Sequence, residues 1–121
     1  MNSKIEVLSD GLLENVTGGE SGKTDHTYTV NDQNYHAFIR SAVNVVILFG
    51  VSWSRTCESA CDIIEKLTAD NRNTRVGVFE VTNSEYLIYK LGIKSVPTTI
   101  RYKGGTEIQR IEGTGHITRL F

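Results

Sequence analysis

The chain has 121 residues, a formal net charge of −1, two cysteines and one proline. This length supports one domain with a single core, and the near-neutral charge gives no argument for binding nucleic acid or an acidic membrane surface. Two cysteines are too few for a disulfide scaffold, and no apolar run approaches the roughly twenty residues needed to cross a bilayer.

Residues 1–19 have a pattern of their own. Apolar residues recur at helical spacing and acidic residues interrupt them, so the segment lacks the continuous apolar centre of a secretory signal. Gly18 and Gly19 end the pattern. Its apolar stripe consists of Ile5, Leu8, Leu12, Leu13 and Val16.

Five of these positions resemble the double-glycine leaders of bacteriocins and related peptides from Gram-positive bacteria: Leu8, Leu13, Val16, Gly18 and Gly19. The resemblance implies that the peptidase of an ABC exporter docks on the apolar face and cuts after Gly19, where side chains would not fit the cleft. It also implies synthesis in the cytoplasm followed by export. Leu12 departs from the family, which often has Glu there. The alternative is an N-terminal amphipathic helix with a glycine C-cap.

The next stretch predicts a linker at residues 20–25 and a short strand at residues 26–30. Asn31 or Asp32 is expected to cap the helix that follows. His36 lies off the apolar face of that helix, so we expect an exposed histidine rather than a ligand. The apolar face carries Tyr35, Phe38 and Ile39.

In the centre of the chain, the spacing of the apolar residues changes at Gly50. Residues 45–49 are consecutively apolar, which is typical of a strand buried on both faces. Apolar residues then recur at helical spacing, which predicts a helix. This stripe consists of Cys57, Ala60, Cys61, Ile64 and Leu67.

The second half predicts a strand at residues 76–81 and a helix that Asn83 or Ser84 caps and Gly92 ends. Residues 98–103 and 107–112 predict a hairpin across Gly104 and Gly105. Residues 116–121 leave room only for a short final helix.

The strand, the Trp-containing turn and the thiol in the first helical turn resemble the active-site unit of the thioredoxin superfamily. That family reads Asp-Phe-Trp-Ala-x-Trp-Cys-Gly-Pro-Cys. Aligned on Trp53, this chain has Ser54 at the position of the attacking cysteine and Cys57 at that of the resolving cysteine. Leu48 stands where the family keeps a buried carboxylate that assists proton transfer.

Residues 92–98 read Gly-Ile-Lys-Ser-Val-Pro-Thr and resemble a second segment of the same family. The resemblance implies a cis bond before Pro97, packing of Pro97 against the active-site turn, and a peptide-binding groove beside Trp53 in which the backbone of Val96 pairs with a ligand strand. It covers about residues 27–115 and implies an α/β thioredoxin-like fold, with a central mixed sheet flanked by helices, over residues 26–121.

Serine at position 54 removes the thiolate that begins disulfide exchange, and its expected role is a helix N-cap. Cys57 and Cys61 could form an atypical redox pair, although a regular helix disfavours the bridge. We expect both thiols to be covered, with Cys61 the deeper. No cofactor or metal is expected, because two thiols make half a zinc site; a copper site including His116 is the alternative.

Three functions follow as hypotheses. The first is a thioredoxin-like protein with impaired or absent redox activity that binds a peptide or protein and is linked to a peptidase-containing ABC exporter. The second is an atypical thiol-disulfide oxidoreductase that uses Cys57 with Cys61. The third is a secreted bacteriocin-like or signalling protein.

Overall fold

The computed structural model describes residues 27–69 and 73–120. The leader-like segment at residues 1–19, with its processing positions Leu8, Leu13, Val16, Gly18 and Gly19, lies outside the described residues. The linker at residues 20–25 lies outside them as well.

The described chain is built on a five-stranded sheet with the order β1-β3-β2-β4-β5. Strands β1 and β2 both run parallel to β3, whereas β4 is antiparallel to β2 and β5 is antiparallel to β4. The strands are β1 (Thr27–Val30), β2 (Asn44–Gly50), β3 (Thr74–Glu80), β4 (Thr98–Lys103) and β5 (Thr106–Glu112). The mixed sheet confirms the predicted thioredoxin-like fold.

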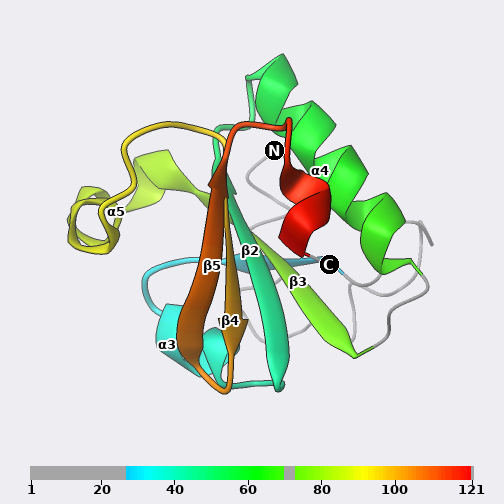
Figure 1. Cartoon of the computed structure of the whole chain (residues 1–121). Coiled ribbons are helices and arrows are strands. Elements are labelled where there is room, and N and C mark those ends of the chain that lie inside the picture. The colour runs from blue at the N-terminus through cyan, green and yellow to red at the C-terminus, as the bar shows by residue number, and fades with distance from the viewer. Residues whose placement is uncertain (1–26, 70–72, 121) are drawn as a thin grey trace.

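Helices cover both faces of this sheet (Figure 1). Helices α3 (Tyr35–Ile39) and α5 (Glu85–Leu91), with the short 3₁₀ turn η2 (Val81–Asn83) before α5, belong to one face. Helix α4 (Arg55–Thr68) and the 3₁₀ helix η3 (Ile117–Leu120) lie on the other. The short final helix agrees with the sequence prediction, and its buried Ile117 and Leu120 contribute to the core.

Strand β2 is central in the sheet and buried over six consecutive residues, as its apolar run predicts. Its alternate side chains enter two separate cores. One core lies under α4 and is formed by Val46, Leu48, Ala60, Ile64, Val76, Ile117 and Leu120. The other lies under α3 and α5 and includes Val45, Ile47, Phe49, Phe79, Ile100 and Tyr102.

The ends of α5 and α3 test the helix caps that the sequence predicted. Ser84 Oγ accepts the amide of Leu87 at 3.2 Å, and Gly92 ends α5 with φ 71°, so both predicted boundaries of α5 are confirmed. The predicted cap of α3 was wrong. Asn31 Oδ1 instead closes a turn by accepting the amides of Gln33 and Asn34, each at 2.9 Å, and the helix begins only at Tyr35.

Two tyrosines meet inside the core under α3. The hydroxyls of Tyr35 and Tyr102 lie 2.8 Å apart, and both side chains are buried. Burial raises the pKa of both hydroxyls above the ordinary value of 10.0, and the shared hydrogen bond raises the pKa of Tyr102 further. Each tyrosine is therefore held in its neutral form by the fold.

This pair predicts an alkaline loss of stability. A raised pKa in the folded state favours the protonated hydroxyl, so the contribution is fully present below about pH 10 and is lost as the pH rises above it. We expect the free energy of unfolding to fall there by up to about 1.4 kcal/mol per pH unit for each tyrosine. Urea unfolding at a series of pH values above about 10 measures this free energy. The Tyr35→Phe/Tyr102→Phe variant should show a shallower fall with pH. An equal slope in both proteins would contradict the assignment.

Candidate functional site

The candidate site lies at the edge of the sheet where β2 ends and β4 begins. Gly50 is the last residue of β2, and Phe49 pairs with Thr98 at the start of β4. The turn after Gly50 and the segment before Thr98 therefore meet at one edge. The structure brings together there the residues that the resemblance singled out in the two segments, Trp53 and Ser54 in one and Val96 and Pro97 in the other.

Ser54 begins α4 as its N-cap. Its backbone is extended, its Oγ accepts the amide of Cys57 at 3.2 Å, and its carbonyl accepts the amide of Glu58 at 3.0 Å. The side-chain oxygen thereby satisfies one of the amides that a helix start leaves without a partner. The predicted cap is confirmed.

Cys57 lies in the first turn of α4, with its thiol turned toward the sheet. The residue is 5% exposed, and its Sγ accepts the amide of Val51 at 3.4 Å. Gly50 is close beneath it, since a Cβ at that position would lie 2.8 Å from Cys57 Sγ. The thiol is thus enclosed by the backbone of the turn.

Cys61 is less covered than Cys57, which corrects the expectation that it would be the deeper thiol. It is only partly buried, and its Sγ lies 3.8 Å from Glu65 Oε2. The same carboxylate oxygen accepts the hydroxyl of Thr27 at 3.2 Å. The helical stripe was predicted correctly, but Cys57 packs against Gly50 and Val51 and is the more buried of the two thiols, whereas Cys61 is only partly buried. Cys57 and Cys61 are both thiols rather than a disulfide.

Both thiols border one cavity of about 220 Å³ between α4 and the strands β1, β2 and β3. Leu48, at the position of the family's buried carboxylate, also borders this cavity, so its wall there is apolar. The two charged residues among the lining are Glu58 and Glu80. The lining residues are Thr27, Tyr28, Thr29, Leu48, Gly50, Val51, Ser52, Cys57, Glu58, Cys61, Val78 and Glu80.

Glu80 is a site residue that the sequence reasoning missed. Its Oε1 accepts the amide of Ser52 at 3.0 Å, and its Oε2 accepts the hydroxyl of Thr82 at 3.1 Å. The carboxylate therefore fixes the turn that carries Trp53. The sequence offered only a partial signal, a carboxylate near the end of a predicted strand, because the pairing of Glu80 with Gly50 is set by the register of β2 and β3.

The outer side of the site is apolar and open. Trp53 is 72% exposed and Val96 is 38% exposed, whereas Pro97 is buried. The bond between Val96 and Pro97 is cis, as predicted. The carbonyl of Pro97 accepts the amide of Gly113 at 2.8 Å, which ties this segment to the end of β5. The backbone of Val96 makes no hydrogen bond to the rest of the described chain.

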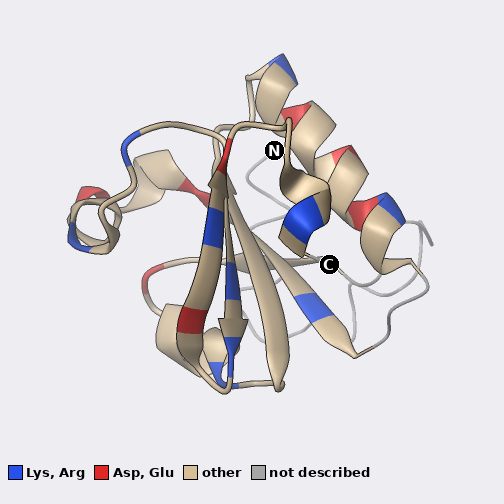
Figure 2. Cartoon of the chain, in the orientation of Figure 1, with Lys and Arg blue, Asp and Glu red and all other residues tan. Residues whose placement is uncertain are grey.

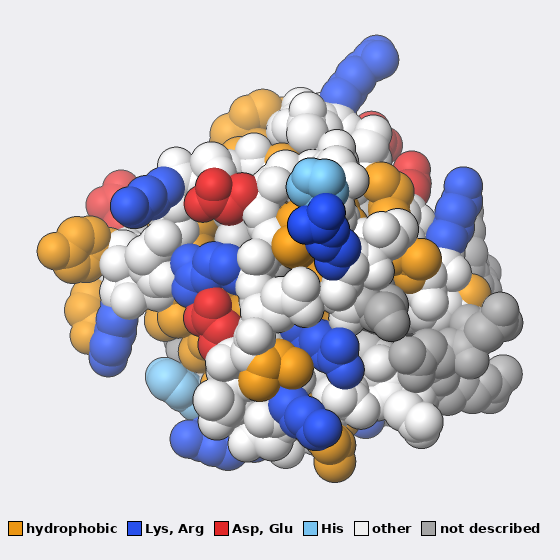
Figure 3. Space-filling model, viewed as in Figure 1, with side chains coloured by type: hydrophobic (Ala, Val, Ile, Leu, Met, Phe, Trp, Pro, Cys, Tyr) orange, Lys and Arg blue, Asp and Glu red, His pale blue; other side chains and the backbone are white. Residues whose placement is uncertain are grey.

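Charge is unevenly distributed around the site. Acidic side chains recur along α4 (Figure 2), and they include Glu58, Asp62 and Glu65. On the face shown in Figure 3, Lys and Arg side chains lie over β4, β5 and η3 with acidic side chains among them. The charged residues that line the cavity beside the two thiols, Glu58 and Glu80, are both acidic.

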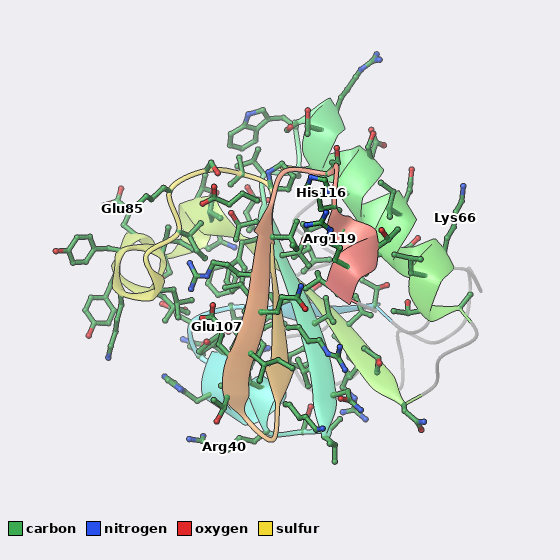
Figure 4. The ribbon with its side chains drawn as sticks, in the orientation of Figure 1. Arg40, Lys66, Glu85, Glu107, His116 and Arg119 are labelled. Carbon is green, nitrogen blue, oxygen red and sulfur yellow. The ribbon has the colours of Figure 1, made fainter. Side chains whose placement is uncertain are left out.

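Among residues 27–69 and 73–120, no three His, Cys, Asp or Glu side chains lie together as the ligands of a metal ion would. His116 lies where β5 leads into η3, near Arg119 (Figure 4), rather than with the thiols in a recognisable ligand set. His36 is exposed, as expected. None of the described helices is both long and apolar enough to cross a bilayer.

Comparison with known proteins gives a consistent result. The family model described as thioredoxin matches residues 26–121. A thioredoxin from Chlamydia caviae is 27% identical over 84 residues, which are 69% of this chain and 81% of that protein. Thioredoxin-2 from Saccharomyces cerevisiae is 30% identical over 69 residues, which are 57% of this chain and 66% of that protein.

Solved structures show the same fold. A mutant thioredoxin from Halobacterium salinarum superposes with a TM-score of 0.70 at 19% identity, covering 83% of this chain and 88% of that chain. Oxidised mitochondrial thioredoxin 3 from Saccharomyces cerevisiae gives a TM-score of 0.68 at 23% identity, covering 78% of this chain and 90% of that chain. The residues that the family model matches include the whole described sheet and all its helices, and the chain belongs to the thioredoxin family.

Proposed function

We propose that this chain is a peptide-binding member of the thioredoxin family that does not carry out ordinary dithiol exchange. One observation carries the proposal: Ser54 occupies the start of α4 as a hydrogen-bonded cap, at the position that aligns with the family's attacking cysteine. Two exposed apolar side chains, Trp53 and Val96, support the binding part of the proposal.

The loss of exchange follows from the chemistry of the two positions. Exchange begins when a thiolate attacks a disulfide sulfur and forms a mixed disulfide. A serine hydroxyl does not ionise near neutral pH, and the oxygen of Ser54 is engaged with the amide of Cys57. Cys57 itself is enclosed by Gly50 and Val51 and offers little access to a protein disulfide.

The binding part of the proposal depends on Trp53 and Val96. A large aromatic that is 72% exposed beside an exposed β-branched residue is typical of a contact surface rather than a core. The backbone of Val96 is available to an added strand because no described residue bonds to it. An extended peptide can therefore combine backbone hydrogen bonds at Val96 with apolar contact at Trp53.

A fluorescence titration tests this binding. We expect insulin B chain, with its cysteines carboxymethylated, to change the emission of Trp53, the single tryptophan of the chain. Isothermal titration should show that Trp53→Ala weakens the affinity by about tenfold or more, since interface aromatics commonly contribute above 1 kcal/mol. Tyr89→Ala serves as the matched control, because Tyr89 is an 85% exposed aromatic on α5 and outside the two site segments.

Two outcomes would contradict the binding proposal. One is an absence of saturable binding by the full chain. The other is equal weakening by the Trp53 and Tyr89 variants, which would indicate nonspecific contact with exposed aromatics. A negative charge at Val96 (Val96→Asp) should also weaken binding, since it would place a carboxylate in the apolar groove.

The second part of the proposal concerns export. The double-glycine pattern at residues 1–19 supports a leader that the peptidase domain of an ABC exporter recognises and removes, so the mature protein would act outside a Gram-positive cell. A bacteriocin-like or signalling role of the exported protein is compatible with the same leader.

Leader removal gives a specific prediction. Incubation with a double-glycine peptidase domain should release residues 1–19, which intact mass spectrometry detects. Gly19→Val should abolish the cut because the cleft excludes side chains, and Leu13→Asp should slow it by placing a charge in an apolar groove. Glu14→Gln is the control, because Glu14 is not one of the apolar positions of this segment. Cleavage of the Gly19→Val variant at the wild-type rate would leave the capped helix as the better interpretation.

The alternative function is an atypical oxidoreductase that uses Cys57 with Cys61. The observation in its favour is that both thiols border one cavity. It requires distortion of the first turn of α4, because residues four apart in a regular helix place their Cβ vectors in parallel.

A further inference from the structure

We propose that Arg110 is a positioning residue for peptide binding: its guanidinium fixes the point at which the chain leaves α5 and thereby orders the backbone of Val96 before a peptide arrives. The inference rests on the peptide binding proposed above. Residues 92–97, here called the Val96 segment, run from the end of α5 to the edge of the sheet where α4 begins (Figure 1). The place of Val96 therefore depends on how the two ends of this segment are held.

The register of the sheet places Arg110 on the face that α5 covers. Arg110 lies on β5 opposite Ile100, and Glu107 lies opposite Tyr102. Both partners on β4, Ile100 and Tyr102, belong to the core under α3 and α5. Paired residues of antiparallel strands have their side chains on the same face of a sheet. Arg110 and Glu107 are therefore both directed toward the side of α5 rather than that of α4.

The guanidinium of Arg110 binds the last carbonyls of α5. Its Nη2 donates to the carbonyl of Leu91 at 2.9 Å, and its Nη1 donates to the carbonyl of Gly92 at 3.3 Å. The last carbonyls of a helix have no partner within the helix, so side-chain donors can satisfy them. Gly92 has already left the helical conformation, with φ 71°. The bond to its carbonyl therefore fixes the direction in which the Val96 segment departs.

Glu107 holds this guanidinium in its orientation. Glu107 Oε2 accepts Nε of Arg110 at 2.7 Å, and its Oε1 accepts Nη2 at 2.8 Å, so the pair is bidentate. The planar guanidinium has five N–H donors, enough to bind one carboxylate and two carbonyls at once. A lysine ammonium carries the same charge but lacks this fixed fork. The arrangement therefore depends on the shape of arginine as well as on its charge.

The other end of the Val96 segment is held separately. The carbonyl of Pro97 accepts the amide of Gly113 at 2.8 Å, and Thr98 Oγ1 donates to the carbonyl of Ser95 at 2.7 Å. Gly113 directly follows β5, the strand that also carries the arginine, so β5 holds the segment at both ends. The backbone of Val96 lies between these attachments. A peptide strand then meets a backbone that is already ordered, which lowers the entropy lost on binding.

The first test uses the full chain, the carboxymethylated insulin B chain and Arg110→Lys, which keeps the charge and loses the fork. We expect isothermal titration to show an affinity lower by roughly threefold to tenfold, because the segment must then be ordered during binding. Arg101→Lys is the matched control. Arg101 lies on β4 and donates to the carbonyl of Leu120 at 2.9 Å, so it attaches η3 on the other face of the sheet. This variant should keep the wild-type affinity.

Amide hydrogen exchange, measured by NMR, separates positioning from a general loss of stability. The amides of Gly92 and Ile93 donate to carbonyls of α5 at 3.0 and 3.1 Å, at the end of the helix that the arginine binds. Both amides should exchange faster in Arg110→Lys than in the wild type, since local opening becomes easier there. The amide of Gly113, at the other end of the Val96 segment, should keep its wild-type rate.

A variant with the charges exchanged, Glu107→Arg/Arg110→Glu, tests whether the ion pair alone is sufficient. It places a carboxylate beside carbonyls that need a donor, so it should bind the peptide no better than Arg110→Lys.

Three results would overturn the inference: wild-type affinity in Arg110→Lys, wild-type affinity in the charge-exchanged variant, and equally accelerated exchange at Gly92 and Gly113. An absence of saturable binding by the wild type would instead contradict the proposed function itself. The exchange rates would still decide whether Arg110 holds the Val96 segment, so the two proposals fail separately.

Discussion

The purified chain is expected to reduce insulin no faster than dithiothreitol alone. The reason is the absence of an attacking thiolate at position 54, where the serine oxygen instead accepts the amide of Cys57. Turbidity from precipitating insulin chains measures the rate, with an active thioredoxin assayed in parallel. The expected deficit spans orders of magnitude, because the missing group forms the covalent intermediate itself.

Ser54→Cys should restore measurable reduction, and Ser54→Ala should not. The recovered rate should stay below that of an active thioredoxin, since Leu48 offers no carboxylate beneath Cys57 for proton transfer. General acid–base assistance contributes roughly 10²–10⁴-fold in enzymes, which sets the scale of the remaining deficit. Adding Cys57→Ser to the Ser54→Cys variant should remove the gain.

A wild-type rate close to that of the active thioredoxin would contradict the proposed function. The alternative dithiol enzyme would then be correct, and Cys61→Ser in the wild-type background would identify it by abolishing the activity. Binding of the carboxymethylated B chain would still be informative, because it does not depend on any thiol.

Gly77→Ala is expected to have the largest effect on stability. Gly77 lies in the middle of β3, where it pairs with Ile47 and Tyr28. A Cβ there would lie 2.5 Å from Val30 Cγ2 and 2.7 Å from Phe38 Cε2. Val30 and Phe38 are both buried, so neither side chain can move away without disturbing the core under α3.

The expected cost is about 2–3 kcal/mol in the free energy of unfolding, as for other overpacked cores. Urea denaturation measures it by linear extrapolation. Gly115→Ala is the matched control, because nothing lies within 4 Å of its Cβ position. Val30→Ala combined with Gly77→Ala should cost less than the sum of the two single changes, since the smaller side chain relieves the contact. A neutral Gly77→Ala would show that the core repacks easily.

Much of the fold could be predicted from the sequence because its signals are local and agree with one another. The apolar run before Gly50 and the helical stripe after it define β2 and α4, and Gly104 with Gly105 defines the hairpin, where both have positive φ. The prediction that Asn31 caps α3 failed because an asparagine side chain accepts backbone amides equally well in a turn and at the start of a helix.

The site was harder to predict, since it depends on which distant residues the topology brings together. The cap at Ser54 is local and was predicted. The support of the Trp53 turn by Glu80 depends on the register of β2 and β3, which no single stretch of sequence specifies. The greater burial of Cys57 depends on its contact with Gly50 and Val51, which helical periodicity alone does not specify.

The cap at Ser54 also bears on how such a protein could change over evolutionary time. A thiol is a weaker hydrogen-bond acceptor than a hydroxyl, so a change to cysteine at this position would loosen the start of α4. Replacing a good N-cap typically lowers stability by about 1 kcal/mol. A gain of exchange chemistry through this substitution would therefore begin with a loss of stability. A change from serine to cysteine at this position would therefore have to tolerate a less stable start of α4 before any thiol chemistry could be selected.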